Sequence, residues 1–117
     1  MNNNTALYFG LAALVLLFIV QRLRARKAPA SLVLEKIRSG ARIIDVRSPQ
    51  EFAGPSYPKA RNIPLDVLPA RMSDLPKDKP IVLYCASGAR SAQAARMLKK
   101  AGFADVVSAG GLGDMPR

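Results

Sequence analysis

The chain has 117 residues and a formal net charge of +10, from 18 Lys and Arg against 8 Asp and Glu. Its one Cys and lack of His exclude an internal disulfide, every His-based triad and every His general base. A structural zinc site has too few ligands, and we expect no metal and no cofactor. The basic residues are scattered and no nucleic-acid motif occurs, so we expect no nucleic-acid partner either.

An uncharged apolar run occupies residues 5–20. Four basic residues follow it: Arg22, Arg24, Arg26 and Lys27. A spanning helix needs about 20 apolar residues, with roughly 17 as the lower limit, and the segment comes into this range when Leu23 is counted and the arginines extend toward the headgroups. A signal peptide is the alternative, but it carries its positive charge before the apolar run. We therefore expect residues 1–27 to form a transmembrane helix with a basic flank, contacting the membrane through residues 5–23.

The same charge asymmetry predicts an orientation. Segments rich in Lys and Arg stay on the cytoplasmic side of a membrane. The sequence thus predicts a single-pass protein with its N-terminus outside and the residues from Arg22 onward in the cytoplasm. A reducing compartment also suits an unpaired thiol such as that of Cys85.

Residues 28–117 alternate strand-like and helix-like segments, which predicts one α/β domain with a central, largely parallel sheet flanked by helices. We expect strands at residues 42–46, 60–63, 81–85 and 105–108. We expect helices at residues 31–38, from 49 onward, at 66–72 and at 91–101. The strand at 81–85 is apolar throughout, as in a central parallel strand covered on both faces.

Local signals refine these elements. Ser31 is expected to cap the first helix of the domain. Ser48, Pro49 and Glu51 combine an N-cap, a proline at the first helical position and the acid of a capping box, which predicts a short helix with Phe52 turned toward the core. Three residues of the last helix are expected to face the core: Ala92, Ala95 and Leu98. Two glycines are expected to turn the chain after the last strand: Gly110 and Gly111.

The residues around Cys85 indicate a reactive site. Active sites of parallel sheets form beyond the carboxyl ends of strands, and both Asp45 and Cys85 lie at such ends. We expect the backbone amides from Ala86 to Arg90 to curl around the sulfur, and the next helix to present its positive end, so that the thiol ionises readily. Gly88 allows backbone angles that a Cβ would hinder, and Arg90 can direct its guanidinium at an anion. A buried, inert cysteine is the other interpretation.

The run from Cys85 to Ser91, Cys-Ala-Ser-Gly-Ala-Arg-Ser, resembles the active-site loop of rhodanese domains, whose common form is Cys-x-x-Gly-x-Arg-Ser. Residues 43–52, 60–65 and 102–111 resemble other segments of that family, in the same order. The resemblance implies a rhodanese-like α/β fold and a sulfurtransferase that carries sulfane sulfur as a persulfide on Cys85. The donor would be a small anion such as thiosulfate, and the acceptor a thiol, cyanide or a protein.

The resemblance also implies roles for the neighbouring residues. Donor and terminal sulfur would be held by the loop: Ala86, Ser87, Gly88, Ala89 and Arg90. Supporting roles would fall to three residues: Asp45, Arg47 and Ser91. For Arg47, an ion pair with Glu51 is a second interpretation, compatible with the first. The sequence departs from the family pattern at residues 55–60 and lacks the Trp-containing helix after the last glycine pair, so we expect a short closing helix or none.

Three alternatives stay open. A Cys-based phosphatase or arsenate reductase also combines a cysteine, a loop and an arginine. In its common loop five residues separate the cysteine from the arginine, whereas four separate Cys85 from Arg90 in this chain. A non-catalytic rhodanese-like binding module is the second, although such modules often lack the cysteine. The third is a sulfur relay to a protein acceptor, which the sequence does not separate from a free sulfurtransferase.

Overall fold

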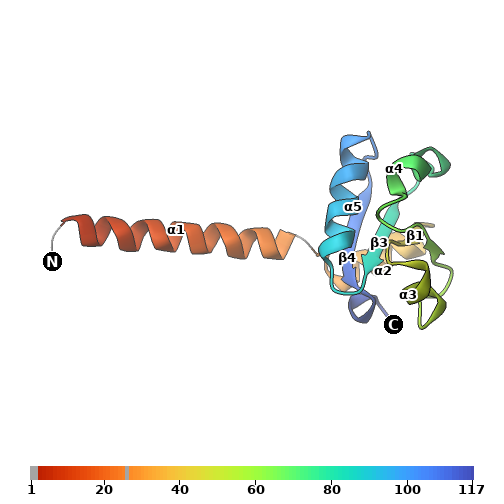
Figure 1. Cartoon of the computed structure of the whole chain (residues 1–117), viewed down its shortest axis with the longest axis horizontal. Coiled ribbons are helices and arrows are strands. Elements are labelled where there is room, and N and C mark those ends of the chain that lie inside the picture. The colour runs from red at the N-terminus through yellow and green to blue at the C-terminus, as the bar shows by residue number, and fades with distance from the viewer. Residues whose placement is uncertain (1–2, 26) are drawn as a thin grey trace.

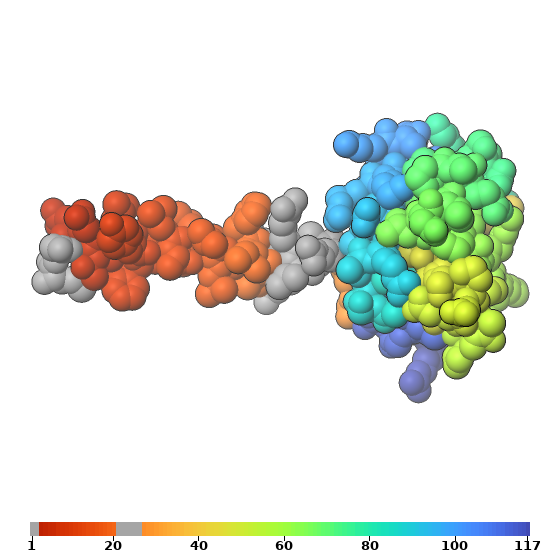
Figure 2. All heavy atoms as spheres, viewed as in Figure 1, coloured from red at the N-terminus to blue at the C-terminus, as the bar shows by residue number. Residues whose placement is uncertain are grey.

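A computed structural model describes residues 3–25 and 27–117, except for the side chains of residues 21–25 (Figure 1). Helix α1 (Asn3–Ala25) stands apart from an α/β domain (Figure 2). Its residues 3–20 have a mean hydropathy of 1.9, and none of this stretch is buried. By length and composition α1 can span a membrane, although a signal sequence has the same properties. The predicted membrane contact of Leu23 and the predicted basic flank at Arg22, Arg24 and Arg26 concern side chains outside the described part of the chain.

The domain contains a four-stranded sheet in the order β2-β1-β3-β4, and every neighbouring pair is parallel. The strands are β1 (Arg42–Asp45), β2 (Arg61–Asn62), β3 (Ile81–Cys85) and β4 (Val106–Gly111). The expected α/β fold with a parallel sheet is confirmed, and β3 is central and buried throughout. The prediction that Gly110 and Gly111 turn away from the sheet is wrong, because β4 continues until Gly111 pairs with Cys85.

Four helices surround the sheet: α2 (Ala30–Arg38), α3 (Pro49–Ala53), α4 (Leu68–Arg71) and α5 (Ala89–Lys100). Two 3-10 turns complete the domain, η1 (Met72–Asp74) and η2 (Leu112–Asp114). Ser31 does not cap α2, because that helix starts one residue earlier and Pro29 occupies the cap position. The helix expected at 66–72 is a single turn that continues as η1.

Helix α3 starts as its sequence predicts but does not contribute a buried face. The Ser48 hydroxyl accepts from the Glu51 amide at 3.2 Å, and the Glu51 carboxylate accepts from the Ser48 amide at 3.1 Å. This reciprocal capping box fixes the start of the helix. The prediction that Phe52 faces the core is wrong: α3 is barely longer than one turn, has no buried residue, and leaves Phe52 partly exposed.

The two faces of the sheet have separate apolar cores. Along β3, Ile81, Leu83 and Cys85 point to the side covered by α5, while Val82 and Tyr84 point to the side covered by α2. This alternation follows from the two-residue period of a strand. The predicted core positions of α5 are confirmed, since Ala92, Ala95 and Leu98 are at most 6% exposed.

The C-terminal residues close the α2 side of the sheet. The expected short closing element is η2, a single 3-10 turn. After it, Met115 is buried and the Pro116 carbonyl accepts from the Tyr57 hydroxyl at 2.7 Å. The Tyr57 amide in turn donates to the Tyr84 hydroxyl at 2.9 Å, and the two rings meet edge to face. Tyr57, from the segment that departs from the family pattern, therefore joins the chain end to the central strand.

Candidate active site

Cys85 lies at the carboxyl end of β3, beneath the short loop of residues 86–88, and is fully buried. The Gly88 amide donates to its sulfur at 3.0 Å, and the Ser91 amide donates at 3.4 Å. The Ser91 hydroxyl lies 3.6 Å from the same sulfur. The thiol thus has polar partners from both the loop and the first turn of α5.

The loop is shorter than the sequence suggests. Helix α5 begins at Ala89, so Ala89 and Arg90 belong to its first turn instead of to a longer loop. The sulfur receives backbone hydrogen bonds from Ser87, Gly88 and Ser91, so the expected row of amides from Ala86 to Arg90 forms only in part. Gly88 adopts a φ of 110°, the left-handed region that its expected backbone freedom requires. The side chains of Ala86 and Ser87 are exposed above the sulfur.

Two opposing effects set the ionisation of Cys85. Burial raises the pKa of the thiol, because a charged sulfur loses hydration. Hydrogen bonds from the Ser91 amide and hydroxyl, and from the Gly88 and Ser87 amides, lower the pKa and outweigh burial. The net pKa therefore lies below the ordinary value for a cysteine, without any histidine.

The Ser91 hydroxyl connects the sulfur to β4. Its oxygen lies 2.8 Å from the Ser108 hydroxyl, 3.1 Å from the Gly88 carbonyl and 3.2 Å from the Gly110 carbonyl. A serine has one hydroxyl proton, so it serves one of these acceptors at a time. When Cys85 ionises, the hydroxyl can turn toward the sulfur and leave the carbonyls, which couples the charge of the thiol to the end of β4.

Arg90 has a partner that the sequence did not indicate. Its guanidinium forms two bonds with the Glu51 carboxylate, at 2.7 and 3.0 Å. This contact, with the Ser48 amide, lowers the pKa of Glu51 to about 2. The proposed ion pair between Arg47 and Glu51 is wrong, because Glu51 pairs with Arg90 across 39 positions of sequence. No local pattern signals that pairing, and the capping box already accounts for Glu51.

Asp45 and Arg47 pair with each other on the other face of the sheet. The Arg47 guanidinium donates to both Asp45 oxygens, at 2.7 Å for the shortest bond, and to the Pro55 carbonyl at 3.0 Å. It also lies over the Tyr84 ring, 5.6 Å from the ring centre. Asp45 is in register with Tyr84 and not with Cys85, so the side chain points away from the sulfur although both strands end at the same edge. Both residues are at most 7% exposed.

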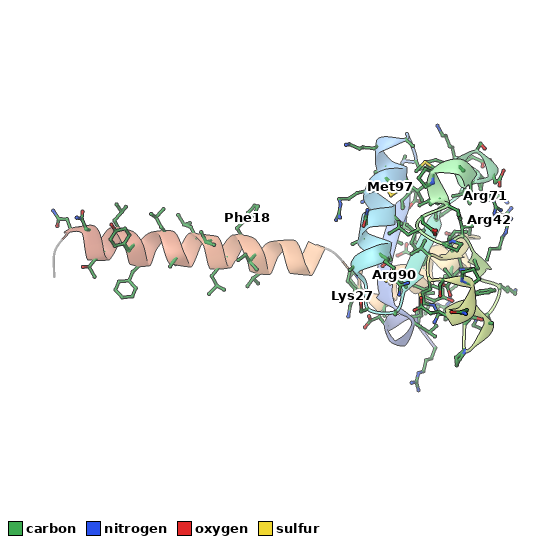
Figure 3. The ribbon with its side chains drawn as sticks, viewed as in Figure 1. Phe18, Lys27, Arg42, Arg71, Arg90 and Met97 are labelled. Carbon is green, nitrogen blue, oxygen red and sulfur yellow. The ribbon has the colours of Figure 1, made fainter. Side chains whose placement is uncertain are left out.

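A depression of about 680 Å³ adjoins Arg90 between α5 and residues 46–49 and 64–69. Its lining is largely apolar and includes Val46, Leu65, Val67 and Met97, while Cys85 is absent from it. Two of its lining residues, Arg90 and Met97, are labelled on α5 in Figure 3. Across residues 3–25 and 27–117, no group of three or more His, Cys, Asp or Glu side chains could hold a metal ion.

Comparison with known proteins adds a family to this geometry. The sequence profile described as Rhodanese-like domain matches residues 29–112. The uncharacterized protein YqhL of Bacillus subtilis is 38% identical over 98 residues, covering 81% of this chain and 78% of YqhL. The thiosulfate sulfurtransferase PspE of Escherichia coli is 36% identical over 74 residues, covering 62% of this chain and 71% of PspE. A solved E. coli rhodanese with anions superimposes with a TM-score of 0.62 at 34% identity, covering 66% of this chain and 95% of its own.

The buried pair predicts a stability effect. Replacing Asp45 with Asn leaves the Arg47 charge buried without a counter-charge, so we expect the free energy of unfolding to fall by about 3–5 kcal/mol. Urea unfolding of the full chain in mild detergent, followed by circular dichroism, measures this. Glu51→Gln makes the same chemical change at a more exposed ion pair and should cost much less. Equal losses in the two variants would contradict the assignment.

The sulfur contacts predict a change in thiol reactivity. Replacing Ser91 with Ala removes a hydroxyl that stabilises the thiolate, so the pKa of Cys85 should rise and the pH midpoint of its alkylation by iodoacetamide should move upward. At neutral pH we expect alkylation to slow roughly tenfold, since a hydrogen bond to a charged group contributes about 1.5–3 kcal/mol. Ser108→Ala is the matched control, because Ser108 contacts Ser91 but not the sulfur. The same shift in both variants would disprove a direct role for Ser91.

Proposed function

Because the chain belongs to the rhodanese-like domain family, we propose that it is a sulfurtransferase that carries sulfane sulfur as a persulfide on Cys85. The observation that carries this proposal is the thiol itself, buried at the end of β3 with its pKa lowered by Gly88 and Ser91. A nucleophilic sulfur needs to be a thiolate near neutral pH, and these donors favour that form. The sulfurtransferases among the relatives support the same activity.

In the first half-reaction, the Cys85 thiolate attacks the outer sulfur of a donor such as thiosulfate. A new sulfur–sulfur bond forms at Cys85, the bond within thiosulfate breaks, and sulfite leaves with the electron pair. In the second, a thiolate or cyanide attacks the outer sulfur of the persulfide and the electron pair returns to Cys85. The Gly88 and Ser91 donors stabilise negative sulfur before and after each transfer.

Arg90 is the residue we assign to the donor's oxygens. Its guanidinium has five N–H donors, and Glu51 occupies two of its nitrogens while leaving the group 37% exposed. An anionic donor can therefore share or replace Glu51 as a partner. Ala86, Ser87 and Ala89 form the exposed rim through which the donor reaches the sulfur. Asp45 and Arg47 support the site indirectly, by fixing the end of β1 beside β3.

A thiosulfate incubation tests the activity. The full chain in detergent should gain the mass of one sulfur atom on Cys85, measured by intact mass spectrometry without reductant, and lose it on addition of cyanide with release of thiocyanate. Cys85→Ser should do neither, because an alkoxide does not form at neutral pH. A folded wild-type chain that takes up no sulfur would instead favour a binding module, and turnover of an aryl phosphate would favour a phosphatase.

We further propose that residues 1–27 anchor the catalytic domain, residues 28–117, in a membrane. The length and apolar character of α1 support a spanning helix, and the basic residues after it support an N-terminus outside and a catalytic domain in the cytoplasm. The absence of buried residues in the 3–20 stretch is consistent with a lipid environment, because the domain does not cover it.

Labelling from one side of the membrane tests the orientation. In spheroplasts of a bacterial host, a membrane-impermeant maleimide should label Asn4→Cys but not Ser87→Cys, each made with Cys85→Ser to remove the native thiol. Both positions are exposed, so both should react after lysis. Labelling of Ser87→Cys in intact spheroplasts would reverse the orientation.

A further inference from the structure

The residues that follow α1 pack beside the loop over Cys85. The Ala28 amide donates to the Ser108 carbonyl at 2.7 Å. The Lys27 ammonium forms an ion pair with Asp114 at 2.9 Å. Ser108 belongs to β4 and Asp114 to the turn directly after it, so the chain enters the domain at the carboxyl end of β4.

The same end of β4 supports the catalytic loop. A Cβ added at Gly110 would lie 2.9 Å from Lys27 Cδ, and one added at Gly88 would lie 3.4 Å from Gly110 Cα. The stem of Lys27 therefore packs on Gly110, and Gly110 packs on Gly88. Lys27 and Arg90 lie on the side of the domain that faces α1 in Figure 3, with Met97 farther along α5.

The connection from α1 is shorter than the domain. Six residues separate Val20, the last of the apolar run, from Lys27, and the seven residue steps between the two span at most about 25 Å when fully extended. Helix α1 continues to Ala25, which shortens that reach to roughly 15 Å. The shorter principal extents of the molecule are 29 and 27 Å. While Lys27 keeps its contacts with Gly110 and Asp114, the part of the domain farthest from Lys27 therefore cannot turn toward the bilayer.

We propose that the catalytic loop faces the membrane surface, and that Cys85 passes its sulfur to a thiol held at that surface. This inference rests on the proposed sulfurtransferase activity and membrane anchor. The acceptor thiolate attacks the outer sulfur of the persulfide, its new sulfur–sulfur bond forms as the bond to Cys85 breaks, and the Cys85 thiolate is restored with no external oxidant.

The surface around the loop suits such an approach. Ala86 and Ser87 are exposed and have small side chains, so the loop itself places no large side chain over the sulfur. The basic residues of the connecting segment, together with the net charge of +10, favour a surface of anionic headgroups. The loop end is thereby held against the layer where a membrane-bound thiol would lie.

Fluorescence quenching tests the orientation independently of activity. The full chain carrying Cys85→Ser receives a fluorophore at either Ala89→Cys, at the start of α5, or Ala53→Cys, at the end of α3, two exposed positions. Helix α3 lies farther from α1 than the start of α5 does (Figure 1). The protein is reconstituted in phosphatidylcholine and phosphatidylglycerol vesicles that contain a nitroxide-headgroup lipid. We expect the Ala89 probe to be quenched more strongly than the Ala53 probe. Equal quenching, or stronger quenching at Ala53, would overturn the proposal.

A spacer variant tests the transfer. A Gly/Ser insertion of about 20 residues between positions 26 and 27 has a reach of roughly 25 Å and releases the domain from the surface. Transfer from persulfide-loaded full chain to a thiol-headgroup phospholipid should fall about threefold, as the effective concentration drops with linker length. Transfer to soluble glutathione, the matched control, should not change.

The outcomes separate the two proposals. An unchanged rate to the lipid thiol would refute surface transfer while the glutathione reaction upholds the sulfurtransferase. Absence of transfer to either acceptor would refute the sulfurtransferase itself, and the transfer proposal with it. Failure of the chain to float with vesicles would refute the anchor.

Discussion

The contact between the end of β4 and the loop after Cys85 is the constraint on which the site depends. Gly111 lies so close to the Ala86 carbonyl that a Cβ there has no room, and Gly110 adopts a φ of 92°. This approach sets the path of residues 86–88 and brings the Gly88 amide to 3.0 Å from the sulfur. Lys27 packs on the other side of Gly110. One glycine pair thereby fixes the catalytic loop, the sulfur donors and the entry point of the N-terminal segment.

Thiol activation here is a balance between burial and donors. A fully buried cysteine is ordinarily an inert apolar residue, because desolvation disfavours the thiolate. At Cys85 the Ser91 amide and hydroxyl and the Gly88 amide reverse that outcome, each hydrogen bond to a charged atom contributing about 1.5–3 kcal/mol. The Asp45–Arg47 pair is a buried charge with a structural role. The two charges neutralise each other, face away from the sulfur and keep β1 in place beside β3.

The elements that the sequence predicts well are those set by neighbouring residues. The apolar run at 81–85, the capping box of Ser48 and Glu51, and the core face of α5 each follow from local spacing. The errors that bear on the site concern long-range partners. Neither the pairing of Arg90 with Glu51 nor that of Cys85 with Gly111 leaves a trace in local pattern, since each joins distant segments. Register also decides that Asp45 aligns with Tyr84, which places it on the face opposite the sulfur although both strands end together.

The Glu51–Arg90 pair bears on which molecules the site accepts. Because the pKa of Glu51 is about 2, its carboxylate stays ionised throughout the physiological range and offsets the guanidinium charge. A free anion must compete with a partner that the fold already holds in place, without the entropy cost of association. The attraction of the loop for negative sulfur then comes mainly from the Gly88 and Ser91 donors, which recognise one atom instead of a polyanion. We expect a site of this kind to distinguish its substrates by access to the sulfur, and in the proposed membrane arrangement that access depends on where the N-terminal connection holds the loop.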